Sequence, residues 1–181
     1  RTSGIWTVGE TMPITWSTKG AINNIQIWYS KNNFVSYTVA YSGLNTGSFN
    51  WPVPDFISTD KSVKIRIVDS ADSTVYRDSI AFKIRGNLSI SQPAGLEVWT
   101  VNTVKNIFWT STGSIPNVRL EYSRDNFTSE IVEIAVRANT AGANSYNWTI
   151  PDAISPLANG VKVRVMDIND SSVFNISNGF K

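Results

Sequence analysis

One pattern occurs twice in this sequence of 181 residues, and this duplication constrains the fold more than any other feature. Trp6 and Val8 recur as Trp99 and Val101, at a spacing of 93 residues. Further along, residues 63–69 match residues 161–167 at a spacing of 98. A repeat of about 90 residues has the length of a small domain, not of a short solenoid unit. The sequence therefore predicts two domains of one fold, residues 1–86 and residues 87–181.

Apolar and polar residues alternate along short segments of each copy. Ile25, Ile27 and Tyr29 alternate with other side chains, and the same period of two recurs in the segments matched at residues 63–69. Alternation of β-branched and aromatic residues is typical of half-buried antiparallel strands. Turn residues interrupt these segments about every 8–12 residues, and no window has a helical stripe. We predict an all-β fold of two tandem immunoglobulin- or fibronectin-like β-sandwiches. The alternative, one larger β-barrel, fits the duplicated motif order poorly.

Composition argues against most enzyme classes. The chain has no histidine and no cysteine, so it cannot build Ser-His-Asp or Cys-His nucleophile systems, disulfides or the usual zinc sites. Its clustered acids, Glu121, Glu130 and Glu133, are expected on an open strand face without a pocket. We expect no catalytic activity. The net charge of +2 and the absence of a long apolar run indicate neither a nucleic-acid partner nor a membrane span.

The second copy opens with an alternating segment, residues 88–92, that has no counterpart in the first copy. We therefore expect the first copy to lack its opening strand. The residues would then come from a longer tandem array, or a neighbouring subunit would supply the strand; arbitrary ends are the simplest alternative. The join at residues 84–88 is too short for a flexible linker, which predicts a stiff rod. Subunit contacts are expected at the chain ends and around Trp28.

The tryptophans divide into two groups. Trp16 and Trp109 occupy matched positions and are expected to be buried, each in its own sandwich. Trp28 instead has Glu121 as its counterpart, so we expect it on the exposed outer face of its sheet, where an indole can stack on a sugar ring or on another protein. An exposed tryptophan without any binding function is equally compatible with the sequence. Tyr37 and Tyr41 are candidates for the same patch, although their strand phase is open.

Two further groups of polar residues repeat or cluster. Acidic turns occur in both copies and could hold Ca²⁺, the one cofactor candidate, although such residues also form simple Asx turns. The candidate calcium ligands are Asp69, Asp72, Asp167 and Asp170. Sequons for N-glycosylation occur only in the second copy. The asparagines concerned are Asn87, Asn126, Asn147, Asn169 and Asn175.

Several motifs together resemble a known family. Residues 93–95 (Pro-Ala-Gly), 99–101 (Trp-Thr-Val), 107–111 (Ile-Phe-Trp-Thr-Ser) and 145–152 (Ser-Tyr-Asn-Trp-Thr-Ile-Pro-Asp) are similar to the Ser/Thr-rich Ig-like domain of fungal cell-wall glucan-assembly (KNH-like) proteins, which occurs in tandem in prokaryotic surface proteins. The resemblance implies an extracellular or cell-surface β-sandwich module and carries over no catalytic residue.

The expected function follows from the duplication and the resemblance. We expect a structural module of an extracellular fibre, surface layer or adhesin stalk, whose partners are like subunits or further repeats of the same polypeptide. The alternative is a carbohydrate-binding accessory module of a secreted protein, with a cell-wall or surface polysaccharide as its partner.

Overall fold

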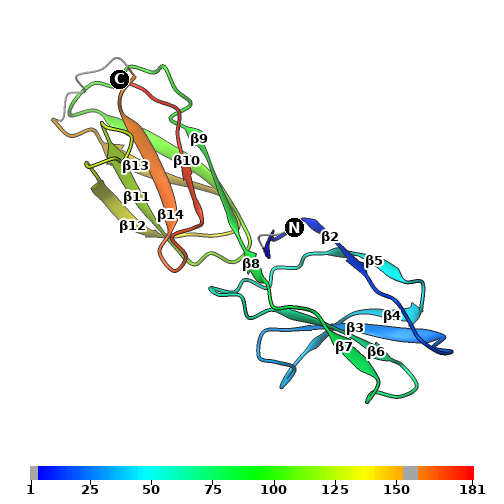
Figure 1. The fold of residues 1–181 in the computed structure, drawn as a ribbon. Helices are drawn as coiled ribbons and strands as arrows, with labels where there is room; N and C mark the ends of the chain where they lie inside the picture. The colour runs from blue at the N-terminus through cyan, green and yellow to red at the C-terminus, as the bar shows by residue number, and fades with distance from the viewer. Residues whose placement is uncertain (1–3, 153–158) are drawn as a thin grey trace. The chain divides into compact units, whose positions relative to one another are not determined.

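A computed structural model describes residues 4–152 and 159–181, in which all helix and strand structure is β (Figure 1). The chain divides into two compact units, Arg1–Arg85 and Gly86–Lys181, called unit 1 and unit 2 below. This boundary lies one residue before the expected one. No helix in the described ranges is long and apolar enough to cross a membrane. Residues 1–3, part of an end at which subunit contacts were expected, lie outside the described residues.

Unit 1 is built from short strands paired in three sheets. A four-stranded antiparallel sheet has the order β4-β3-β6-β7, β2 pairs with β5, and β1 pairs with β8. The β1–β8 pair is parallel, which alternation along single strands could not reveal. The strands are β1 (Ile5–Thr7), β2 (Thr11–Thr15), β3 (Asn24–Ser30), β4 (Thr38–Leu44), β5 (Ser48–Pro52), β6 (Lys64–Asp69), β7 (Tyr76–Asp78) and β8 (Lys83–Arg85).

The core of unit 1 lies between these sheets. Alternating residues of β3 point inward, with Ile25 and Ile27 almost fully buried, and Trp51 of β5 packs in the same cluster. Ile84 of β8 is also fully buried there. The cluster thus joins the four-stranded sheet to β5 and β8, as a sandwich core requires.

Unit 2 repeats this strand order and adds a strand at its start. Its four-stranded sheet has the order β12-β11-β14-β15, which corresponds to β4-β3-β6-β7 of unit 1. Its second sheet has the order β13-β10-β9, so β10 has two partners. The strands are β9 (Asn87–Gln92), β10 (Val104–Thr112), β11 (Asn117–Ser123), β12 (Val132–Ala138), β13 (Gly142–Thr149), β14 (Lys162–Asp167) and β15 (Phe174–Ile176).

Matched tryptophans differ in burial between the units. Trp109 of β10 is 2% exposed, as expected for a core residue. Trp16, its counterpart, is only half-buried, so the expectation that both are buried is wrong for unit 1. The difference arises because β9, with its buried Leu88, packs beside β10, whereas β2 pairs only with β5 within the described residues.

Candidate binding surface

The outer face of the β3–β4 hairpin in unit 1 carries a stacked aromatic pair. Trp28 of β3 and Tyr37, just before β4, have ring centroids 4.0 Å apart and planes inclined by 12°. The indole Nε1 of Trp28 donates a hydrogen bond to Oε1 of Gln26 at 2.8 Å. Tyr37 is 49% exposed, whereas Trp28 is half-buried because Tyr37 covers one face of its ring. The two rings form an amphipathic surface with one outward aromatic face.

Tyr41 does not belong to this patch. In the β3–β4 ladder, Tyr41 pairs with the inward-facing Ile27, while Trp28 pairs with Val39 across a register shift. The Tyr41 ring packs against Phe49 at a centroid distance of 4.9 Å, and its hydroxyl donates to the Leu44 carbonyl at 3.2 Å. Because residues opposite each other in an antiparallel ladder share a face, Tyr41 lies on the Ile27 side of the sheet and not with Trp28. The candidate surface therefore reduces to Trp28 and Tyr37.

Glu121, the counterpart of Trp28, is buried, which contradicts the expectation that this position is exposed. Its residue exposure is only 4%. Arg164 of the adjacent strand β14 donates from Nε to Oε2 of Glu121 at 2.7 Å, and Arg119 Nη1 lies 3.9 Å from its other oxygen. A buried carboxylate is tolerated where a cation neutralises it. The two matched residues thus have different partners: Trp28 bonds to Gln26, whereas Glu121 is paired with Arg164.

The corresponding cation of unit 1 is held by different groups. Arg66 pairs with both oxygens of Asp78, at 2.6 and 2.9 Å, and its guanidinium lies over the rings of Phe34 and Tyr76, at 4.1 and 3.8 Å. The hydrogen bonds from Arg66 lower the pKa of Asp78, and the same bonds raise the pKa of Arg66. Arg66 is therefore a structural cation, fixed between a carboxylate and two aromatic rings.

The clustered glutamates of unit 2 are all ion-paired. Besides Glu121, Glu133 lies 3.3 Å from Arg119, and Glu130 lies 2.6 Å from Arg124. Hydrogen bonds from Arg124 lower the pKa of Glu130, the reverse of what a general acid needs at neutral pH. These carboxylates support strand and turn structure and do not form an acid–base pair.

The calcium candidates serve as turn caps. In the unit 1 turn, Asp69 accepts from the amide of Ala71, and Asp72 accepts from the amide and hydroxyl of Thr74. In unit 2, Asp167 and Asp170 accept in the same way from the residues two positions further on. Among the described residues, no group of three or more acidic, histidine or cysteine side chains could hold a metal ion. The geometry is that of Asx turns.

The sequon asparagines lie in different environments. Asn87, Asn126, Asn147 and Asn169 are exposed. Asn126 also accepts a hydrogen bond from Lys162 Nζ at 2.8 Å. Asn175 is half-buried, and its Oδ1 accepts from the backbone N–H of Ile90 at 2.9 Å. Asn175 therefore helps to fix β9 on β15.

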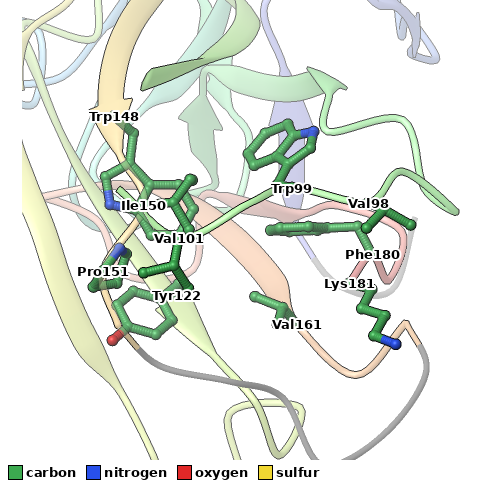
Figure 2. A pocket seen from close by; sticks show the side chains of 10 residues that line it. All are labelled: Val98, Trp99, Val101, Tyr122, Trp148, Ile150, Pro151, Val161, Phe180 and Lys181. Atoms are coloured by element: carbon green, nitrogen blue, oxygen red, sulfur yellow. The ribbon is translucent and has the colours of Figure 1, made fainter. Parts of the chain in front are cut away.

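Unit 2 contains an apolar pocket of about 140 Å³ (Figure 2). Trp99, Trp148 and Phe180 form much of its wall, and Lys181 contributes the one charged side chain among the described lining residues. The ring centroids of Trp99 and Phe180 lie 4.6 Å apart. These walls offer mainly van der Waals contact.

Each unit contains the same hydrogen-bond network, which was not foreseen from the sequence: an asparagine links the matched tryptophan, just after the end of β2 in unit 1 and within β10 in unit 2, to nearby residues. In unit 2, Trp109 Nε1 donates to Asn139 at 2.8 Å, and the Asn139 amide donates to Ser111 and to the Ile115 carbonyl. In unit 1, Asn45 takes the same role towards Trp16, Thr18 and Ile22. The sequence signal that could have revealed this network is the recurrence of asparagine at matched positions 45 and 139 of the two copies.

Comparison with known proteins gives limited likenesses. Neither a family model nor a curated protein matches the sequence. Among solved structures, the fibronectin(III)-like modules of CbhA from Clostridium thermocellum are 13% identical, with a TM-score of 0.32, covering 98% of this chain and 88% of that one. Domains 3 and 4 of rat CD4 are 10% identical, with a TM-score of 0.35, covering 96% and 97%. At these values neither likeness supports a conclusion about this chain. Its own strand pairing, repeated in both units around a core between sheets, shows that the chain is a pair of immunoglobulin- or fibronectin-like β-sandwich units.

Proposed function

We propose that the chain is a structural module of an extracellular fibre, surface layer or adhesin stalk. The observation that carries the proposal is the repeated sandwich with almost no chain between its copies. Only Gly86 separates β8 of unit 1 from β9 of unit 2. Gly86 is the first residue of unit 2, and a Cβ there would lie 2.7 Å from the Thr112 carbonyl oxygen, so this position is closely packed within unit 2.

The proposed partners are like subunits or further repeats of the same polypeptide, outside the cell or at its surface. The resemblance of the repeats to Ser/Thr-rich Ig-like domains of KNH-like type supports this location.

Electron microscopy of material from the native source tests this role. We expect rods or filaments whose repeat along the axis corresponds to two domains, labelled by antibodies against the recombinant chain. Labelling confined to a free, monomeric protein in the medium would contradict the structural role.

A second candidate function is carbohydrate binding at the Trp28–Tyr37 pair. An exposed aromatic face can stack on a sugar ring, and the neighbouring Val35 and Val39 are 88% and 46% exposed. Val39 lies opposite Trp28 in the β3–β4 ladder, so exposed apolar side chains stand beside the aromatic pair, and the function proposed above does not require them.

Titration with cell-wall polysaccharides tests the second candidate. Quenching of tryptophan fluorescence is expected, and Trp28→Ala or Tyr37→Ala should reduce affinity at least about tenfold, corresponding to the 1.4 kcal/mol of a modest stacking contact. Tyr76→Ala is the matched control, because Tyr76 is a 50% exposed aromatic residue on another strand of the same sheet. Equal losses in all three variants, or no quenching, would exclude the aromatic pair as a sugar site.

A further inference from the structure

Among the residues that the structure describes, unit 1 has no strand at the sheet edge where unit 2 has β9. In unit 2, residues 108–112 of β10 pair with β9 on one side, while the strand pairs with β13 on the other. The matched residues of unit 1 are 15–19. Within the described residues, β2 has β5 as its one strand partner, and regular pairing stops at Thr15. The duplication thus supplies an internal comparison between a covered and an uncovered edge.

Burial at matched positions defines the surface that β9 covers. Four apolar residues of unit 2 are at most 4% exposed, and each has a counterpart in unit 1 that is less buried. The largest difference is between Val173, which is 4% exposed, and Val75, which is 45% exposed. The matched pairs are Trp16 and Trp109, Ile22 and Ile115, Ile67 and Val165, and Val75 and Val173. We call Trp16, Ile22, Ile67 and Val75 the open apolar surface of unit 1.

The second observation is that β9 contacts the same elements that carry these residues in unit 2. Besides pairing with β10, β9 packs against β14 and β15. Its Leu88 is 2% exposed, and Ile90 is half-buried on the same face. In unit 1, β6 and the turn before β7 stand where β14 and the turn before β15 stand in unit 2. The uncovered residues therefore coincide with the place of a β9-type strand.

One backbone amide at this edge has a partner. The Trp16 amide donates to the Gly47 carbonyl at 3.1 Å, on the β5 side. Residues 16–19 belong to no strand, and on strand addition the alternation of amide directions along β2 would turn the amide of Ser17 away from β5. Pro13 also faces that side, but its counterpart, Asn106, lies outside the stretch that pairs with β9. The lack of an N–H at Pro13 therefore does not obstruct pairing at residues 15–19.

We propose that this edge of unit 1 binds an extended polypeptide segment with alternating apolar residues, of the type Leu88-Ser89-Ile90 in β9. The segment adds a strand beside residues 15–19 and places its two apolar side chains on the open apolar surface. Hydrophobic contact with Trp16 and Val75 and new backbone hydrogen bonds stabilise it together. The inference rests on the proposed structural role only in so far as a further repeat of the same polypeptide, and not a second copy of this chain, would supply the segment.

Strand binding is measured on the full chain, without any filament. The probe is a synthetic peptide with the sequence of Gly86–Pro93, and the same eight residues are also placed directly before Arg1 in a second sample. In this sample the added leucine precedes Trp6 by the same number of residues as Leu88 precedes Trp99. Tethering also raises the effective concentration of the peptide to about the millimolar range. The expected result is hydrogen exchange at residues 15–19 slowed by roughly tenfold or more, with blue-shifted fluorescence of Trp16.

Two controls make the test decisive. A probe carrying aspartate in place of its leucine and isoleucine should give neither effect, and Ser17→Pro should weaken binding more than Ser17→Ala because it removes the outward amide. Unchanged exchange with the tethered probe, or equal effects of both probes, would overturn the proposal. Protection that grows with protein concentration in the absence of a probe would overturn it too, by assigning the edge to a second copy. If filaments are found but the probe does not bind, the strand-binding proposal is wrong while the proposed structural role stands.

Discussion

Replacing Trp109 by alanine will destabilise unit 2 by about 3–5 kcal/mol, and Trp16→Ala will destabilise unit 1 by clearly less. Trp109 is 2% exposed, so its removal leaves a cavity and deprives Asn139 Oδ1 of the indole donor at 2.8 Å. Trp16 is half-buried, so less apolar surface returns to water when it is removed. Denaturant unfolding followed by hydrogen-exchange mass spectrometry assigns each loss to its unit.

Conservative variants separate packing from hydrogen bonding. Trp109→Phe keeps most of the ring and removes the indole N–H, so it should cost about 1–3 kcal/mol, the range of a buried acceptor left unsatisfied plus some lost volume. Equal losses for Trp16→Ala and Trp109→Ala would show that the difference in burial has no energetic weight, and would also weaken the case for an open apolar surface on unit 1.

Replacing Arg164 by alanine will destabilise unit 2 by about 3–5 kcal/mol, because Glu121 is then left as a buried charge without its nearest cation. The Glu121 side chain is 5% exposed, and Arg119 lies further away, at 3.9 Å. In unit 1, Arg66→Ala should cost less, about 1–2 kcal/mol, because the Asp78 side chain is 27% exposed and can be hydrated, so that the loss comes mainly from the contacts of Arg66 with Phe34 and Tyr76. Equilibrium unfolding of the two matched variants measures both values.

A double variant tests the cause of this loss. Glu121→Leu together with Arg164→Met removes both charges and keeps comparable volume, so its stability should lie within about 1 kcal/mol of the parent chain. If the double variant is as unstable as Arg164→Ala, packing of the arginine side chain, including its place over Phe127 at 4.5 Å, explains the loss instead of the uncompensated charge.

The fold class could be predicted because its evidence is local. Alternation with a period of two identified β3 and β6 before any contact was known, and the turn that follows β6 carries its own Asx chemistry at Asp69. The parallel pair of β1 with β8 was missed, because its two strands are short and far apart in sequence. Strand alternation gives the face of a residue but not the partner of its strand.

The candidate surface was only partly predictable for the same reason. Trp28 was placed on the outer face from its alternation with Ile27, and the structure has it there. Tyr41 lies opposite the inward-facing Ile27, and the register shift beyond this pair brings Val39 opposite Trp28; both depend on how β4 pairs and have no signature in β3 alone. The burial of Glu121 depends on Arg164, which is 43 residues away.

The sequence by itself determined the all-β class, the duplication and which residues are equivalent, because these follow from short-range periodicity and from comparison of the chain with itself. Tertiary structure alone decided how equivalent residues differ. Trp109 is buried and Trp16 is not, because burial depends on a strand packed beside β10 that β2 lacks within the described residues. Exposure is a property of what a residue's neighbours cover, and those neighbours are brought together only when the strands pair.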